Sequence, residues 1–167
     1  MSLKATTMAK KLEKTNAARL LDKAGIQYNL IPYEFDENDL AAQHVADSLG
    51  QDIARVFKTL VLHGDRTGYL VCVIPGDKEV DLKALAKVSA NKKVEMIPVK
   101  DLLKVTGYIR GGCSPIGMKK HFPTYFHTTV HEQDIIYVSA GVRGLQIEIS
   151  SSDLIEFTQA TVAPVGV

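Results

Sequence analysis

The sequence contains only two cysteines, Cys72 and Cys113, and no tryptophan. Two cysteines cannot form the dense disulfide framework of a small secreted domain, so we expect a chain from a reducing compartment, the cytoplasm. No apolar run approaches the roughly 20 residues that cross a membrane, and none at the N-terminus has the form of a secretory signal. We therefore expect a cytoplasmic location and no membrane partner.

The chain also lacks a large net charge of either sign. The formal net charge is +1 at pH 7, with 20 lysines and arginines against 19 aspartates and glutamates. A protein that coats nucleic acid is normally far more basic, so this chain could bind a polyanion only through a local patch. The basic residues that could form such a patch are Lys92, Lys93, Arg110, Lys119, Lys120 and Arg143.

Several motifs that carry chemistry are missing as well. The sequence has no Walker loop, no dinucleotide fingerprint and no strong set of metal ligands, so we expect no cofactor and no metal. His127 and His131 lie four residues apart in a β-rich stretch, which separates their rings by more than about 10 Å. Ser114 lies in Gly-Cys-Ser-Pro-Ile-Gly, whereas a nucleophile elbow needs Gly-x-Ser-x-Gly. Cys113 has no histidine or other base close by in the sequence to activate it.

The length of 167 residues suits one domain. We expect a basic segment over 1–14 and a single domain over 15–167. The predicted helices cover 15–25, 38–50, 81–90, 98–107 and 151–160, and the predicted strands cover 26–30, 55–64, 68–76, 92–97, 124–130, 134–140 and 145–150. The expected helix caps are Thr15 or Asn16, Asn38 or Asp39, and Asp81. Because strands outnumber helices and occur in hairpin-like groups, we expect an α+β fold with a mixed, mostly antiparallel sheet surrounded by helices.

Lys58 is unusual within the predicted strand VFKTLVL. Val56, Lys58 and Leu60 share one side of this strand, because side chains alternate between its two faces. Buried faces seldom admit a lysine unless it is paired. We therefore expect the ammonium group to point into a cavity that receives an anion or a carbonyl group. The alternative, a lysine on a solvent-exposed face, is disfavoured by its apolar neighbours.

Glycines are concentrated in GYIRGGCSPIGMKK, residues 107–120, which has four of them in its first eleven positions. A folded chain uses glycine where the backbone turns sharply or approaches another group closely. A second glycine-containing stretch, VSAGVRG, covers 138–144. Oriented backbone amides beside a cation form an anion or oxyanion site. Together with Lys58, these stretches predict a small pocket for a polar ligand that carries a phosphate or an acyl group.

Five segments resemble the YbaK/EbsC family, the freestanding relatives of the editing domain of bacterial prolyl-tRNA synthetase. They are VFKTLV, KKVEM, TGYIRGGCSPIGMKK, IIYVSAGVRGLQIEIS and DLIEFT, in this order and spacing. The resemblance runs from about Thr15 to Val162 and implies a compact fold with a mixed, barrel-like sheet. It also implies deacylation of mischarged aminoacyl-tRNA. The form GG-x-SP-x-G followed by KK is most similar to members that clear cysteine from tRNA(Pro).

The same resemblance implies partners and site residues. The partners are the 3′ end of an aminoacyl-tRNA and prolyl-tRNA synthetase. Lys58 would hold the 3′ end and act in catalysis with the backbone of Gly111 and Gly112, which faces the aminoacyl ester. The implied substrate-binding residues are Tyr33, Thr59, Ser114, Pro115, Gly117, Ser139, Gly141 and Arg143. The family mechanism has the thiol of the cysteinyl substrate attack the ester carbonyl, which explains why no protein nucleophile is visible.

Some positions depart from the family pattern. Gln146 stands where the family often has an acidic residue, and Ala140 and Val142 stand where glycine and lysine are common. An aromatic residue expected near Leu40 or Ala41 is missing. These differences affect amino-acid specificity and tRNA binding more than the type of reaction. Two alternatives stay open: an Ala-tRNA(Pro) deacylase, and a non-catalytic module that binds a tRNA end or a synthetase.

Overall fold

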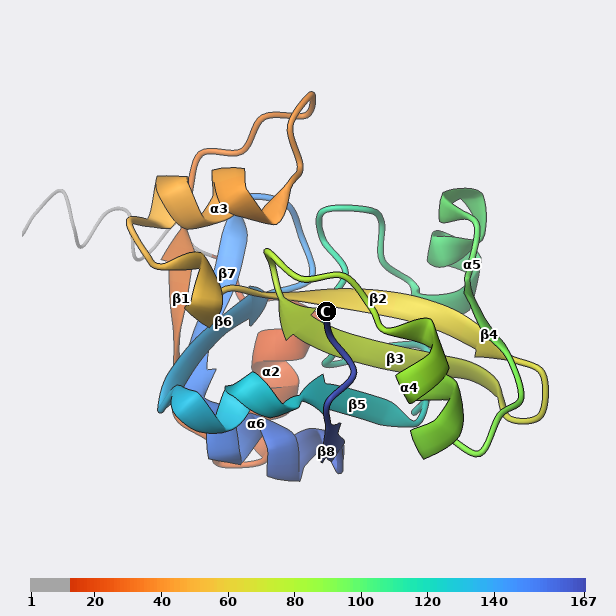
Figure 1. Cartoon of the computed structure of the whole chain (residues 1–167). Coiled ribbons are helices and arrows are strands. Elements are labelled where there is room, and N and C mark those ends of the chain that lie inside the picture. Colours follow the sequence, from red (N-terminus) through yellow and green to blue (C-terminus); the bar gives the residue numbers. More distant parts are fainter. Residues whose placement is uncertain (1–12) are drawn as a thin grey trace, which may run out of the picture.

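A computed structural model describes residues 13–167 (Figure 1). The predicted basic segment 1–14 therefore lies outside the described residues except for Glu13 and Lys14. The Lys14 ammonium lies 2.6 Å from the carboxylate of Asp22 on the first described helix. This ion pair is exposed, and the division into a basic segment 1–14 and a domain 15–167 stays a prediction.

The order of the predicted elements is confirmed. The helices are α2 (Asn16–Lys23), α3 (Ala42–Leu49), α4 (Leu82–Val88), α5 (Leu102–Thr106) and α6 (Ser151–Thr158), with short 3-10 turns η1 (Ile53–Arg55), η2 (Val99–Asp101) and η3 (Thr128–Glu132). The strands are β1 (Tyr28–Pro32), β2 (Phe57–Gly64), β3 (Gly68–Pro75), β4 (Val94–Met96), β5 (Thr124–His127), β6 (Ile135–Ser139), β7 (Leu145–Ser150) and β8 (Thr161–Ala163). Among residues 13–167, no helix has the length and hydropathy to cross a membrane.

The strands lie in two sheets. One has the order β1-β7-β6, and the other has the order β4-β2-β3-β5-β8. Most neighbouring strands are antiparallel, and β3, β5 and β8 run parallel. A single parallel bridge between Val56 and Tyr137 joins the start of β2 to β6. The mixed, mostly antiparallel α+β fold is confirmed. The expected barrel-like sheet is wrong, because this one bridge leaves two separate sheets that do not close.

Strand β2 is held between two hydrophobic clusters. On one face, Phe57 packs with Phe126 of β5 and Ile147 of β7 in the main core, which α2 and α6 cover. On the other face, Leu62 belongs to a second cluster that includes Leu85 of α4. Burying an apolar side chain of this size stabilises the fold by about 1.5–3 kcal/mol. Packing on both faces therefore fixes the register of β2 and the direction of every side chain on it.

Local sequence signals set most helix ends. Thr15 caps α2 and Asp81 caps α4, each accepting a hydrogen bond from the backbone N–H three residues later. The cap expected at Asn38 or Asp39 is wrong, because α3 begins only after Ala41. Asp39 instead accepts a hydrogen bond from the N–H of Ala41 at 3.3 Å. This contact shapes the loop before α3, which forms part of the candidate site described below.

The strand predicted over 124–130 is shorter than expected. It ends at His127 because β5 pairs with β3 and β8 only as far as that residue, and η3 follows. His127 Nδ1 accepts a hydrogen bond from the N–H of Gly166 at 2.9 Å. Strand β8, which the sequence patterns did not predict, lies parallel to β5 and brings the C-terminal residues against the core.

Candidate active site

Three polar side chains share one face of neighbouring strands. Ser139 on β6 pairs with Gln146 on β7. The bridge between Val56 and Tyr137 places β2 alongside β6 in the same direction. Since side chains alternate along a strand, Lys58 follows Val56 on the face that carries Ser139. We call Lys58, Ser139 and Gln146 the floor of the site.

Lys58 is half-buried, and no residue in the described part of the chain forms an ion pair with it. Ile74, its partner on β3, is fully buried, and Val56 and Leu60 flank it on the same face. Lys58 therefore lies among apolar neighbours on its face of β2. The ammonium group of a half-buried lysine without a carboxylate partner is available to an anionic or carbonyl ligand.

Three loops from distant parts of the chain meet beside this floor (Figure 1). The β6–β7 turn, residues 140–144, lies between Ser139 and Gln146. The glycine loop, residues 107–118, contacts this turn, because a Cβ atom placed on Gly111 would lie 3.2 Å from Arg143 Nε. The same Cβ atom would lie 3.1 Å from Leu40, which belongs to the loop before α3. The three loops thus form a rim around Gly111.

The two central glycines of this loop have different roles. Gly111 has φ +86°, a left-handed conformation that strains other residues. The N–H of Gly112 donates to the carbonyl of Ile109 at 2.9 Å, which closes a turn. A Cβ atom on Gly112 would lie 3.2 Å from Val142 Cα, so this glycine permits close packing of two backbones. Within residues 13–167, the Gly111 N–H has no backbone acceptor and remains a free donor.

Tyr108 holds the glycine loop in shape, and the sequence analysis missed it. Its hydroxyl donates a hydrogen bond to the carbonyl of Ile116 across the loop. Its ring lies against Gly141, where a Cβ atom would be only 2.9 Å away. Burial raises the pKa of Tyr108 to about 12, with a smaller contribution from Cys113. An aromatic residue inside a glycine-rich segment was the available signal for such a support.

Four of the predicted substrate-binding residues lie at the rim or the floor. The N–H of Tyr33 donates to the carbonyl of Gly144 at 2.9 Å, which ties the end of β1 to the β6–β7 turn. The Ser139 hydroxyl accepts a hydrogen bond from the N–H of Gly141 at 3.1 Å. Arg143 Nε donates to the carbonyl of Arg110 at 3.0 Å. The structure therefore brings Tyr33, Ser139, Gly141 and Arg143 together with Gly111 and Gly112.

The other four are placed differently. Thr59 is on the opposite face of β2 from Lys58. Ser114 is fully buried, and its hydroxyl accepts a hydrogen bond from the N–H of Ile116 at 3.2 Å. Gly117 faces Tyr108, because a Cβ atom on Gly117 would lie 2.9 Å from the Tyr108 hydroxyl. Pro115, which follows Ser114 in the loop, is half-buried. These loop residues support the shape of the glycine loop, and their contact with a substrate stays a prediction.

Two buried oxygens near the site have no hydrogen-bond partner in the structure. They are Thr59 Oγ1 and Gln146 Oε1. Leaving a buried polar atom unsatisfied costs about 1–3 kcal/mol. Gln146 lies on the floor beside Ser139, at the position where the sequence departs from the family pattern. The floor thus combines a lysine without an ion-pair partner and a buried amide oxygen without a hydrogen-bond donor.

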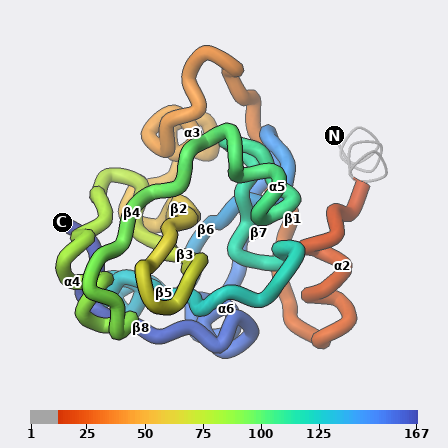
Figure 2. The backbone as a smooth tube through the Cα atoms, turned by 90° about the vertical axis from the view of Figure 1, so that its right-hand side faces the viewer, coloured from red at the N-terminus to blue at the C-terminus, as the bar shows by residue number. Residues whose placement is uncertain are grey.

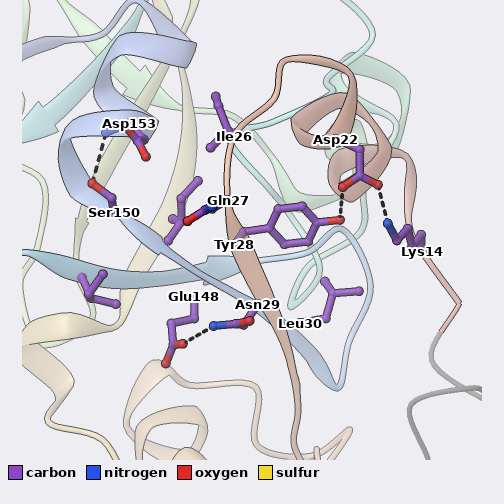
Figure 3. A pocket seen from close by; sticks show the side chains of 12 residues that line it. Lys14, Asp22, Ile26, Gln27, Tyr28, Asn29, Leu30, Glu148, Ser150 and Asp153 are labelled. Atoms are coloured by element: carbon purple, nitrogen blue, oxygen red, sulfur yellow. Dashed lines mark hydrogen bonds and ion pairs between the residues drawn. The ribbon is translucent and has the colours of Figure 1, made fainter.

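A surface hollow between β1, β7 and the end of α2 is a weaker candidate (Figure 3). Its polar groups satisfy one another: Asn29 donates to Glu148 at 2.9 Å, and Tyr28 donates to Asp22 at 2.9 Å. Hydrogen bonds from Tyr137 and Asn29 hold the pKa of Glu148 below its ordinary value. None of the predicted site residues lines this hollow, and no cluster of metal-ligating side chains occurs within 13–167.

Comparison with known proteins identifies the family of this chain. Residues 36–157 match the aminoacyl-tRNA editing domain family. The chain is 50% identical over 160 residues to an Enterococcus faecalis protein named "Putative Cys-tRNA(Pro)/Cys-tRNA(Cys) deacylase EbsC", covering 95% of this chain and 98% of that protein. It is 33% identical over 85 residues to the proline–tRNA ligase of Fervidobacterium nodosum, which is 51% of this chain and 15% of the ligase.

The fold has relatives among solved structures. One, described as "a putative trans-editing enzyme for prolyl tRNA synthetase", superposes with a TM-score of 0.80 over 93% of this chain and 99% of its own. Its sequence identity of 18% shows a shared fold only. The family match covers most of the chain, and the EbsC match covers nearly all of it. The chain belongs to the aminoacyl-tRNA editing domain family, as its YbaK/EbsC motifs predicted.

Proposed function

We propose that this protein hydrolyses the ester bond of mischarged aminoacyl-tRNA and that its preferred substrate is Cys-tRNA(Pro). The 50% identity to EbsC, over nearly the whole of both chains, supports this substrate class. The structural observation that carries the proposal is the half-buried Lys58, which has no ion pair among the described residues and shares a face with Ser139 and Gln146. A synthetase discriminates poorly between near-isosteric small amino acids, so a separate hydrolytic site is useful.

The site offers two groups for charge stabilisation. The Lys58 ammonium can neutralise the 3′-terminal phosphate or polarise the ester carbonyl, and the free N–H of Gly111 can donate to the oxyanion that forms. An aminoacyl ester is already reactive, so positioning it beside such donors can suffice without an acid–base pair.

The nucleophile in this proposal comes from the substrate. The cysteinyl thiol sulfur adds to its own ester carbonyl carbon, and the bond from that carbon to the ribose oxygen breaks. The thiol proton passes to the departing ribose oxygen, which leaves uncharged tRNA and a cyclic thioester of cysteine. Water then opens the thioester to give free cysteine. The site supplies geometry and oxyanion stabilisation, and the thiol supplies the attack.

A panel of charged tRNAs tests this mechanism. Cys-tRNA(Pro), Ser-tRNA(Pro), Ala-tRNA(Pro) and Pro-tRNA(Pro) should be incubated with purified protein, and release of the amino acid measured. We expect the cysteinyl ester to be cleaved at least about 10-fold faster than the seryl ester, because thiols are far stronger nucleophiles than hydroxyls near neutral pH. Equal rates on these two substrates would show that water attacks directly. Fastest cleavage of the alanyl ester would identify an Ala-tRNA(Pro) deacylase.

Cys113 is expected to be dispensable for the reaction. Burial raises the pKa of its thiol to about 12, so almost none is thiolate at pH 8. Cys113→Ser should retain most of the deacylase activity, and a melting curve should accompany the assay because the position is buried. Intact-mass spectrometry during turnover provides the decisive check. A covalent aminoacyl adduct on Cys113 would mean that the protein supplies the nucleophile after all.

Prolyl-tRNA synthetase is the proposed partner for tRNA selection. The small net charge of the chain favours recognition of little beyond the acceptor end. Selection of one tRNA body would then come from the synthetase that produces the mischarged product. Deacylation by the protein alone should therefore differ little between Cys-tRNA(Pro) and Cys-tRNA(Cys). A strong preference for one of them without the synthetase would contradict this division of roles.

A further inference from the structure

Besides the basic N-terminal segment, positive charge exceeds negative charge in one long segment of this nearly neutral chain. Residues 96–131 contain five of the 20 lysines and arginines and one of the 19 carboxylates, Asp101. This segment therefore carries a net charge of +4, and the rest of the chain carries −3. All of its basic residues lie in η2, α5 and the glycine loop with the two lysines that follow it, on the side of the molecule that faces the viewer in Figure 2. Its five basic residues are Lys100, Lys104, Arg110, Lys119 and Lys120.

The lysines gather where the glycine loop begins and ends. The N–H of Lys119 donates to the carbonyl of Thr106 at 3.1 Å, which joins the two ends of the loop. The Lys119 ammonium donates to the carbonyl of Lys104 at 3.3 Å, so it covers the C-terminal end of α5. Lys104 and Lys120 are exposed. The carboxylate of Asp101 lies 3.8 Å from the Lys104 ammonium. One carboxylate is too few to neutralise the four lysines of α5, η2 and the loop ends.

The two ends of the glycine loop, which we call its base, are connected through the loop to the candidate site. From Lys104 and Lys119 the loop runs to Gly111 at the rim, and seven or eight residues of extended chain span at most about 29 Å. Arg110, next to Gly111, is exposed on the same loop. A polynucleotide whose 3′ end lies on the floor would therefore pass cations at the rim and again at the base of the loop. Backbone phosphates are bound by such lysines and arginines regardless of sequence.

We infer that α5 and the base of the glycine loop, through Lys100, Lys104, Lys119 and Lys120, bind the phosphate backbone of the tRNA acceptor end. The inference rests on the proposed function, because it takes the 3′ end to lie at Lys58. Val99 and Leu103 on the same elements are 63% and 54% exposed. Exposed aliphatic side chains suit a protein partner better than RNA, so the test below must separate the two.

Charge reversal at exposed positions tests the inference. The variant Lys104→Glu/Lys120→Glu is compared with a matched control, Lys83→Glu/Lys87→Glu, whose lysines are exposed on α4 and outside this segment. Both variants change the net charge by the same amount. Binding of uncharged tRNA and binding of prolyl-tRNA synthetase are each measured by fluorescence anisotropy, the former over a range of salt concentrations. Deacylation is measured on full-length Cys-tRNA and on a short cysteinylated CCA trinucleotide.

We expect the α5 variant to bind tRNA at least about 10-fold more weakly and to lower the salt slope by about 2, one for each lysine. The control should behave as wild type. Both variants should cleave the short substrate normally, because the floor and rim are unchanged. Equal losses in the two variants would overturn the inference, and so would unchanged tRNA binding with lost binding to prolyl-tRNA synthetase. If wild-type protein cleaves neither substrate, the proposed function is wrong. The anisotropy measurement still tests whether the lysines of α5 and the loop base bind tRNA.

Discussion

Lys58→Ala is expected to lower the deacylation rate about 100-fold or more while the fold survives. A hundredfold loss corresponds to about 2.7 kcal/mol of transition-state stabilisation, the amount typically lost with one oxyanion donor. Because Lys58 has no ion pair among the described residues, its removal leaves no carboxylate uncompensated. Steady-state deacylation of Cys-tRNA(Pro), measured beside a melting curve and circular dichroism, gives the result.

Lys58→Arg distinguishes a point charge from charge in general. The guanidinium group is larger and planar, so it should fail to restore activity in a site shaped for an ammonium group. Lys83→Ala on α4 is the control for loss of a lysine outside the site and should be fully active. A folded Lys58→Ala protein with near-normal turnover would show that Lys58 is only a surface lysine and would remove the central element of the proposed mechanism.

Gly111→Ala is expected to be nearly as damaging to activity. An alanine at φ +86° costs about 1–2 kcal/mol of backbone strain. Its Cβ atom would also lie 3.1 Å from Leu40 and 3.2 Å from Arg143, so both side chains must shift. Relief of this crowding would turn the Gly111 N–H away from the substrate carbonyl. We expect at least about a 10²-fold loss of deacylase activity, the effect of removing one oxyanion donor.

Gly25→Ala separates strain from loss of the site. Gly25 has φ +73° and nothing within 4 Å of an added Cβ atom, so it carries the same strain without crowding a neighbour. Both variants should lower the melting temperature by about 2–8 °C, from 1–2 kcal/mol in a domain of this size. Only Gly111→Ala should lose activity. If Gly25→Ala loses as much, or Gly111→Ala loses little, Gly111 does not provide the oxyanion donor.

Local patterns were sufficient to predict most of the fold. The hairpin of β2 and β3 follows from alternating apolar residues around a turn from Gly64 to Gly68, and Thr15 and Asp81 cap helices as expected. The errors occur where the chain is shaped by distant partners. Strand β8 has three residues and no pattern of its own, and it exists because β5 offers an open edge. The barrel-like sheet was implied by the family resemblance, and the sequence patterns themselves do not show how the two sheets meet.

The site was predicted less evenly. Lys58 and the glycine loop were recognisable because a lysine in an apolar strand and clustered glycines violate local expectations. Tyr108 was missed because its role depends on Gly141, which is more than 30 residues away in sequence and packs against its ring. Similarly, the Gly112 N–H donates to the carbonyl of Ile109 within its own turn, a contact that the sequence does not reveal. Alternation along β2 places Lys58 and Thr59 on opposite faces. It does not show that Cys113 of the glycine loop packs with Val61, which lies on the face of Thr59.

The rim that surrounds Gly111 has a consequence for folding kinetics. It draws on Tyr33 and Leu40 near one end of the chain, the glycine loop, and Arg143 near the other, and every one of these contacts closes a long stretch of chain. Closing long loops costs entropy before any contact repays it, so such contacts form late. Hairpin β2–β3 can pair early, and the rim can assemble only after both sheets have docked. During refolding, recovery of deacylase activity should lag behind recovery of the far-ultraviolet circular dichroism signal.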